Sequence, residues 1–317
     1  MTALLALVTV AAFGTWIPLA QLLPGVPQRS RTLYVTVGNV VFAGIALLAG
    51  GGRLVLGWRD FWLPLAGGVV WTAGSYCAFK AAEAIGIARA AGIWTPLNII
   101  VAFAWGALLF GELDHFPGFR FVLLALALAA VLAGVLLIAG SRDSSGTRDS
   151  SGTRVVPAVA PSPQAIEAGP GRPASRARGG LLWAGAAGLL WGSYFVPAQW
   201  AAEPAQVSNV PLALGMLGAG LALALPAGEP ARLGLRALTA LLGAGVLFGI
   251  GDFTLLGLVA RVGTGTGFTI AQLSLLVNAS IGIWAFHVPK PGTPAARKVI
   301  VGIVIAGAGG CIIGAMR

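Results

Sequence analysis

The stretch that decides the fold is ALTALLGAGVLFGIGDFTLLGLVA, at residues 237–260. Its only charged residue is Asp252, with fifteen uncharged residues before it and eight after it. At a rise of about 1.5 Å per residue, this stretch can cross a hydrocarbon core of about 30 Å as one helix. A carboxylate at that depth costs about 2.5–3.5 kcal/mol on insertion scales, so it should face a polar cavity or a partner.

Two glycines, Gly245 and Gly249, share the helical face of Asp252 and are predicted to leave room beside it. Asp252 is therefore predicted to contact a solute, a proton or an ion. The alternative is an interhelical hydrogen bond that only holds the helices together.

The composition of the whole chain indicates a polytopic membrane protein. Of its 317 residues, 57% are hydrophobic and 9% are charged, too few charges for the surface of a soluble protein. The net charge is +10, and the Lys and Arg residues that give it lie between the apolar runs. We therefore interpret them as a signal of membrane topology and not as a surface that binds nucleic acid. Cys77 and Cys311 have no CxxC spacing, so neither a disulfide framework nor a metal site is predicted. The first apolar run lacks a basic leader and a cleavage site, so we expect a retained span.

Uncharged stretches of spanning length predict an all-α fold of ten transmembrane helices. All but the one with Asp252 are free of charge. The ten ranges are 1–23, 32–52, 61–79, 90–111, 121–140, 179–202, 204–228, 237–260, 262–286 and 299–316.

The segment 141–178 between the fifth and sixth spans has a different composition. It contains the hexapeptide DSSGTR twice, at 143–148 and 149–154, and continues with Pro- and Ala-rich sequence. We predict a flexible linker here, between a first repeat at 1–140 and a second at 179–317.

The two halves resemble one another. FGTW at 13–16 aligns with WGSY at 191–194 at an offset of 178, which also pairs Gln21 with Gln199. GS at 74–75 aligns with GD at 251–252 at an offset of 177. Five spans per repeat would insert the second half upside down, which is the inverted-repeat plan of secondary transporters with a site near the midplane.

The distribution of Lys and Arg predicts the orientation. With the N-terminus outside, fifteen of the twenty basic residues fall on the inner side, and nine against five remain when the linker is left out. We therefore predict a plasma (inner) membrane protein with both termini outside and the linker in the cytoplasm.

Polar and aromatic side chains within the spans are the candidates for solute binding or coupling, because each is costly in the bilayer. Aromatic rings can stack on sugar rings, and amides can both donate and accept hydrogen bonds to hydroxyls. Helix packing and interfacial belts are the alternative for the aromatic residues. The candidates are Asp252, Gln272, Asn98, Asn278, Gln21, Gln199, Trp16, Tyr194, Ser193, Trp71, Trp94 and Lys80.

Charges at the span ends have simpler interpretations. Lys80 lies close to Glu83 and Arg89, which favours snorkelling and a local ion pair. Glu112 ends the fourth span and is expected in solvent.

The small-residue ladders Ala306-Gly310-Gly314 and Ala125-Ala129-Ala133 permit close helix contact, either within the chain or in a homodimer.

The sequence contains none of the common motifs of soluble enzymes. The chain lacks HExxH, GxSxG and GxxxxGK[ST], so neither an enzyme nor a cofactor is predicted. Transport would draw on an ion gradient or on the gradient of the solute itself.

The aromatic-Gly-Ser/Thr-aromatic motif in spans one and six, Thr32-Leu33, and GTGFTIAQLS at 265–274 resemble the glucose/ribose porter family of the drug/metabolite transporter superfamily. The resemblance implies ten helices, a cavity lined by spans 1, 3, 4, 6, 8 and 9, and proton-coupled sugar uptake. The family often has an amide where this chain has Asp252, and Gln where it has Ser75. The first departure would place proton coupling on Asp252.

We therefore predict a secondary carrier that takes up a monosaccharide or similar polar metabolite by alternating access, with the proton as coupling ion. One alternative is an exporter of amino acids or amphipathic drugs from the same superfamily. Another is a non-transporting membrane component, which would tolerate Asp252→Asn.

Overall fold

The computed structural model of the chain describes residues 1–21, 23, 26–51, 57–85, 87–112, 118–140, 174–228, 233–285 and 291–315. All elements in these ranges are helices. The first half contains α1 (Thr2–Gln21), α2 (Gln28–Ala49), α3 (Trp58–Ile85), α4 (Ile87–Leu108) and α5 (Gly118–Gly140). The second contains α6 (Ala174–Trp191), α7 (Val196–Ala201), α8 (Ala205–Ala224), the 3-10 turn η2 (Leu225–Ala227), α9 (Leu235–Val262), α10 (Thr264–Gln272), α11 (Ser274–Trp284) and α12 (Pro294–Ala315).

Eight segments of the described chain are long and apolar enough to cross a membrane, with α6–α7 and α10–α11 each forming one segment. α4 adds a shorter apolar helix at Ile93–Leu108, and α3 carries Trp71, Thr72 and Ser75 in its middle. An all-α, multi-pass membrane protein is thus confirmed. A helix or a broken helix lies over each of the ten predicted ranges, but the number that crosses the bilayer stays a prediction.

The sixth predicted span is broken at the WGSY motif. α6 ends at Trp191, a turn occupies residues 192–195, and α7 begins at Val196. Pro197 has no N–H to donate to the carbonyl of Ser193, and its ring would clash with that carbonyl in a continuous helix. The Ser193 carbonyl instead accepts the Val196 N–H at 3.0 Å. The proline therefore places this break inside the apolar segment Arg178–Ala201.

The ninth predicted span is entered by a sharp reversal and is broken near its middle. Gly263, with φ of 86°, joins α9 to α10 in a conformation that favours glycine. Leu273 then separates α10 from α11, and its N–H bonds to the Ile270 carbonyl at 3.0 Å, in the tighter 3-10 pattern.

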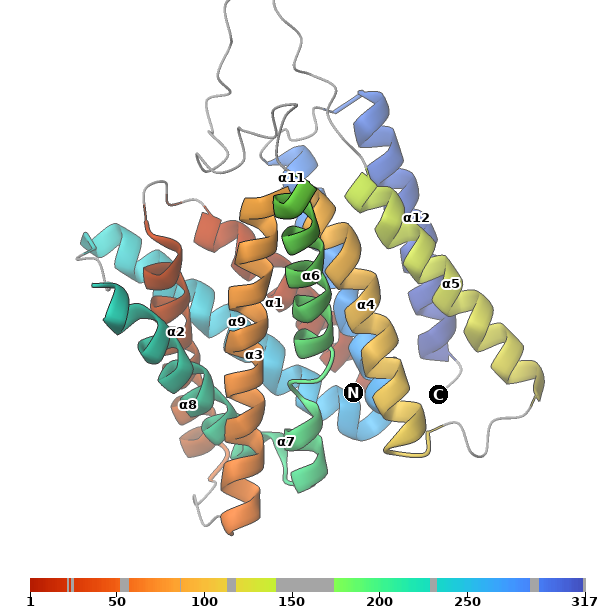
Figure 1. Ribbon diagram of the computed structural model, residues 1–317. Coiled ribbons are helices and arrows are strands. Elements are labelled where there is room, and N and C mark those ends of the chain that lie inside the picture. Colours follow the sequence, from red (N-terminus) through yellow and green to blue (C-terminus); the bar gives the residue numbers. More distant parts are fainter. Residues whose placement is uncertain are drawn as a thin grey trace, which may run out of the picture.

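Most close helix pairs join the two halves of the chain. α1 packs along α9, α3 packs along both α6 and α8, and α2 packs along α9. Figure 1 shows the α2–α8 pair at one edge of the bundle and the α5–α12 pair at the other. α1 begins and α12 ends at the lower side of this view, whereas α5 ends and α6 begins at the upper side.

α3 and α8 cross with their backbones in contact. A β-carbon at Gly215 would overlap the carbonyl oxygen of Leu65, and one at Gly68 would overlap the carbonyl oxygen of Leu212. Only glycine permits this approach at these positions.

α2 and α9 cross in the same way. A β-carbon at Gly38 would overlap the Leu242 carbonyl oxygen, and one at Gly245 would overlap the Val35 carbonyl oxygen. The expectation that Gly245 and Gly249 leave room beside Asp252 is therefore wrong. The backbone of α2 fills the space at Gly245, and the side chains of Asn39 and Phe42 on α2 fill the space at Gly249.

Two further expectations are affected by the fold. The predicted linker lies mostly outside the described residues, but α6 begins at Ala174, inside its predicted end. The segment ASRAR is rich in good helix formers, so its charges do not stop the helix. In α12, Ala306 is fully buried and faces Gly134 of α5, so this part of the ladder packs within the chain.

Candidate functional site

The Asp252 carboxyl is buried on α9 and has one hydrogen-bond partner in the described part of the chain. Tyr194, in the turn between α6 and α7, donates its hydroxyl to Asp252 Oδ1 at 2.8 Å. Asp252 is 1% exposed and Tyr194 is 5% exposed. Asp252 Oδ2 is buried without a hydrogen bond to the described residues. One oxygen is thus positioned by Tyr194, and the other is free to take a proton or a hydroxyl.

Aromatic rings lie next to both members of this pair. Phe248, one turn before Asp252, lies 4.7 Å from the ring of Trp71 and 5.1 Å from that of Trp16. Phe195 and Phe268 stack at 4.6 Å beside Tyr194. The structure therefore brings Trp16, Trp71 and Tyr194 into one apolar cluster with Asp252 on its α9 wall.

Trp94 and Ser193 lie in adjoining contacts. The Trp94 ring is 5.5 Å from that of Trp191, and Trp191 donates to the Trp71 carbonyl at 3.2 Å. Ser193 accepts the Trp105 indole N–H at 2.8 Å and donates to a carbonyl of α6. Its hydroxyl is thus engaged with α4 and α6 and not with Asp252.

Gln199 belongs to a contact that sequence reasoning missed. Its Oε1 accepts a hydrogen bond from the Thr264 hydroxyl at the start of α10. Glu112, which follows α4, accepts the backbone N–H of Thr264 and that of Gly265, the latter at 3.1 Å. We call Glu112, Gln199, Thr264 and Gly265 the α10 latch. The expectation that Glu112 lies in solvent is wrong, because its half-buried carboxylate satisfies free N–H groups at a helix N-terminus.

The predicted amides are only partly brought together. Asn98 is buried in α4, and its Oδ1 has no partner among the described residues. Gln272 ends α10, whereas Asn278 lies in α11, beyond the break at Leu273, and both are half-buried. Gln21 is the last residue of α1, and its side chain lies outside the described part of the structure.

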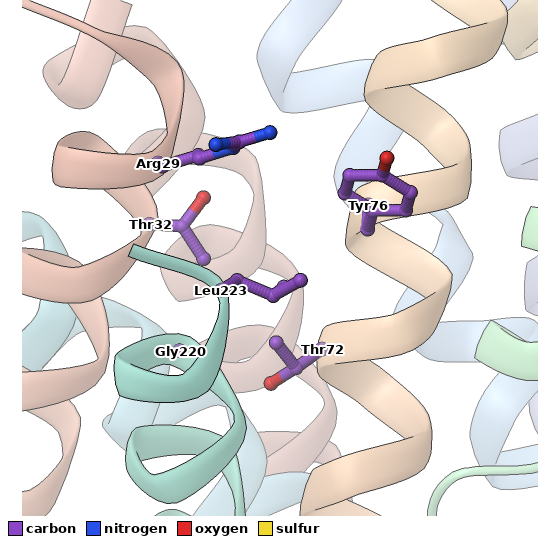
Figure 2. Close-up of a pocket in the computed structure, with 6 residues that line it drawn as sticks. All are labelled: Arg29, Thr32, Thr72, Tyr76, Gly220 and Leu223. Carbon is purple, nitrogen blue, oxygen red and sulfur yellow. The ribbon is translucent and has the colours of Figure 1, made fainter. Parts of the chain in front are cut away.

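Lys80 lies apart from the aromatic cluster. Its ammonium is 5.8 Å from the ring centre of Tyr76, one turn earlier on α3. Tyr76 lines a separate cleft between α2, α3 and α8 (Figure 2). The side chains of Glu83 and Arg89 are outside the described part, so the predicted ion pair stays a prediction.

The comparison with known families decides the class of protein. A family model described as "Sugar transport protein" matches residues 4–161 and 173–316. The chain belongs to this family. Two relatives named "Putative sugar uptake protein", from Listeria innocua and Listeria monocytogenes, are each 24% identical over 317 residues, which is 100% of this chain and 99% of theirs. A crystal structure that is 18% identical matches with a TM-score of 0.67 over 99% of this chain and 97% of that chain, which shows a common fold.

Membership of the sugar transport protein family confirms the resemblance found in the sequence and indicates a transporter and not an enzyme. In the ranges that the structure describes, no group of three His, Cys, Asp or Glu side chains could hold a metal ion.

In this member of the sugar transport protein family, sequence reasoning also missed two buried amides. Asn39 of α2 is 0% exposed, and it donates only to the thioether of Met216, at 3.3 Å. Asn39 Oδ1 and both polar atoms of the Asn209 amide have no partners among the described residues. Asn39 Oδ1 faces Gly249, one turn before Asp252. Each amide interrupts a predicted uncharged span, a signal that could have marked it.

The cleft of Figure 2 does not have the size of a sugar site. It encloses about 20 Å³, room for about one water molecule. The rings around Asp252 are likewise in contact with one another. A monosaccharide would therefore reach Asp252 only after these helices separate.

Proposed function

We propose that this protein takes up a monosaccharide or a similar small polar metabolite by alternating access, coupled to protons. The observation that carries the proposal is the buried Asp252 carboxyl, held by Tyr194 and enclosed by aromatic rings, in a member of the sugar transport protein family. The names of the two Listeria relatives support uptake of a sugar.

The solute site combines stacking surfaces with hydrogen-bonding groups. Trp16, Trp71 and Tyr194 supply flat apolar faces that suit the carbon faces of a sugar ring. Asn98 and Gln272 add amides that donate and accept. A buried amide oxygen without a partner costs about 1–3 kcal/mol, and a sugar hydroxyl would remove that cost at Asn98.

Asp252 binds the coupling proton in this proposal. With Oδ1 held by Tyr194, the free Oδ2 is where a proton can reside when the site is closed. An isolated charge in apolar surroundings is far more costly than a neutral acid. Protonation therefore favours the closed arrangement, and release of the proton favours reopening to water.

An inverted repeat of five plus five spans would supply the two alternating states, and the helix crossings support it. The contacts of the α2–α9 crossing recur in the α8–α3 crossing at a constant offset of 177 residues. The equivalent pairs are Val35 and Leu212, Gly38 and Gly215, Leu65 and Leu242, and Gly68 and Gly245. A single offset for two separate crossings is expected of an internal repeat, with the site at the interface of the halves.

The α10 latch closes one side of the site. Glu112 belongs to the first half, whereas Gln199 and Thr264 belong to the second. α4 ends and α10 begins at the lower side of Figure 1, where α1 also begins. With the predicted orientation of both termini outside the plasma membrane, the latch is the outer gate.

The test is uptake of labelled monosaccharides into transport-deficient cells, with and without a protonophore. We expect uptake by the wild type that the protonophore abolishes and that Asp252→Asn reduces to background. Asp60→Asn, at the start of α3, is the matched control and should transport normally. Uptake that survives Asp252→Asn would contradict the role of Asp252. No uptake of any sugar, with the protein verified in the membrane, would contradict the proposal and favour an exporter.

A further inference from the structure

Asn39 of α2 is held in one orientation inside the bundle. The residue is 0% exposed, and its Nδ2 donates to the thioether sulfur of Met216 at 3.3 Å. A thioether can accept a hydrogen bond but has no hydrogen to donate. The amide therefore presents its nitrogen to α8 and leaves its oxygen for α9.

The oxygen of this amide lies against the face of α9 that carries Asp252. A β-carbon at Gly249 would come within 2.6 Å of Asn39 Oδ1, so this oxygen occupies the space where Gly249 has no side chain. Gly249 and Asp252 are three residues apart, so they share one face of α9 and are separated by about 4.5 Å along its axis. The Asn39 oxygen and the Asp252 carboxyl are therefore neighbours on that face.

Both neighbours have a buried oxygen that lacks a donor. Asn39 Oδ1 and Asp252 Oδ2 have no hydrogen bond within the described residues. An amide oxygen and an ionised carboxylate are both acceptors, so in the ionised state two acceptors would share this face of α9 away from water. A buried acceptor without a donor is costly, so this arrangement disfavours the carboxylate.

The surroundings of Asp252 match a neutral carboxylic acid instead. A protonated carboxyl accepts a hydrogen bond at its carbonyl oxygen and donates one from its hydroxyl. The Tyr194 hydroxyl donates to Oδ1 of Asp252 at 2.8 Å, and Asn39 supplies an acceptor on the same face of α9. A proton on Oδ2 would satisfy both unpaired oxygens, either directly or through one bridging water.

Other charged and titratable groups of the helices that contact α9 are more distant. α1, α7, α8 and α10 carry no charged residue. Tyr34 of α2 reaches the aromatic cluster, five residues before Asn39. The arginines of α2 and α9 lie at least eight residues from Asn39 or Asp252, about 12 Å along either helix: Arg29, Arg31, Arg236 and Arg261.

We propose that Asn39 is a positioning residue for the coupling proton, and that its oxygen accepts the hydrogen bond of the protonated Asp252 carboxyl. The inference rests on the proposed function, in which Asp252 carries that proton. Tyr194 and Asn39 then hold the two oxygens of one neutral acid. When the proton leaves, the hydrogen bond to Asn39 is lost, whereas the one from Tyr194 remains.

The test is the pH profile of sugar uptake. Uptake by this carrier should fall as the pH rises through the value at which Asp252 loses its proton. Asn39→Leu removes the acceptor, so the midpoint should move to lower pH by about one unit, the effect of one hydrogen bond. Met216→Leu nearly conserves volume and frees the amide to donate to the carboxylate, so its midpoint should move in the same direction. If Asn39→Leu fails to fold, Met216→Leu decides.

The matched control is Asn209→Leu. The Asn209 amide on α8 is 1% exposed, and both of its polar atoms lack partners in the ranges that the structure describes. This variant should keep the wild-type midpoint. An unchanged midpoint with Asn39→Leu, or an equal shift with Asn209→Leu, would overturn the proposal. A shift to higher pH would overturn it as well, because Asn39 would then be a donor to the carboxylate. Uptake that Na⁺ drives in the presence of a protonophore would place a sodium ion, and not a proton, between the two oxygens.

Infrared titration of the purified full chain separates this inference from the proposed function. The carbonyl band of protonated Asp252 is identified by its loss in Asp252→Asn, and its decrease with rising pH gives the midpoint without any transport. A wild type that takes up no sugar would contradict the proposed function. The infrared midpoints of the wild type and Asn39→Leu would still decide whether Asn39 holds the proton, and equal midpoints would show that it does not.

Discussion

Removing the Glu112 side chain should open the α10 latch. In the structure this carboxylate accepts the N–H groups of Thr264 and Gly265, and it joins the end of α4 to the start of α10. Glu112→Ala leaves both N–H groups without this acceptor and removes a negative charge from a helix N-terminus. The closed arrangement loses stability, whereas the open one, in which water solvates these groups, is unaffected.

The size of the effect follows from the two hydrogen bonds and the exposure of the site. A hydrogen bond to a charged group contributes about 1.5–3 kcal/mol. Glu112 is only half-buried, so water replaces part of both bonds in the variant. After allowing for this solvation, we take the closed arrangement to lose about 2 kcal/mol of stability when both hydrogen bonds of Glu112 are removed. At about 1.4 kcal/mol per factor of ten, the open fraction rises about 30-fold.

The assay measures the accessibility of a residue behind the latch. Ala198 of α7 is 2% exposed, so we would introduce Ala198→Cys into a chain that lacks Cys77 and Cys311. A membrane-impermeant maleimide is added from the outside, and the labelling rate follows the open fraction. We expect labelling to be about 30-fold faster with Glu112→Ala.

The control is Glu203→Ala, which removes another half-buried carboxylate, one close in sequence to Gln199. Glu203 has no hydrogen bond in the described part of the chain, so labelling should stay at the wild-type rate. A Glu112→Ala rate within about twofold of the wild type would refute the latch, since even 1 kcal/mol predicts about fivefold. A similar increase with Glu203→Ala would point to general loosening.

Three further predictions concern single side chains. Tyr194→Phe removes the donor to Asp252 and should lower kcat/KM for sugar uptake about tenfold or more, with an unchanged amount of protein in the membrane; normal uptake would contradict the pairing. Gly215→Ala should destabilise the purified protein by about 1–3 kcal/mol in thermal unfolding, while Gly218→Ala, which has open space around it, should not; equal stabilities would contradict the close crossing. Asn39→Leu removes a buried amide with an unpaired oxygen, so it should preserve stability and reduce uptake; unchanged uptake would assign Asn39 to packing alone.

The sequence alone was sufficient for the features that depend on local composition. Uncharged stretches mark the spans because the length of an apolar helix is set by the bilayer. The need of Asp252 for a partner could be read from its position within residues 237–260, and the structure shows Tyr194 in that place. Pro197 marks the break before α7 by the same local reasoning, because a proline cannot continue the hydrogen-bond ladder of a helix.

Features that depend on contacts between distant residues could not be predicted from the sequence. Glu112 resembles any charged residue at a span end, and only the reversal at Gly263 brings the N-terminus of α10 to it. The space beside Gly245 could not be assigned, because a glycine permits a cavity and a close helix equally well. The structure assigns that space to α2.

The two glycine crossings also determine which parts of the molecule can move. Where backbone touches backbone, a sliding motion would drive carbonyl oxygens into neighbouring α-carbons, so α3 with α8, and α2 with α9, should each travel as one rigid piece. Each piece contains one helix from either half of the chain. Each moving unit then contains helices from both halves of the chain. When the units move, the side-chain contacts between them change, whereas the backbone contacts within them do not. A disulfide between α3 and α8 should leave uptake intact, whereas one between α4 and α10 should stop it.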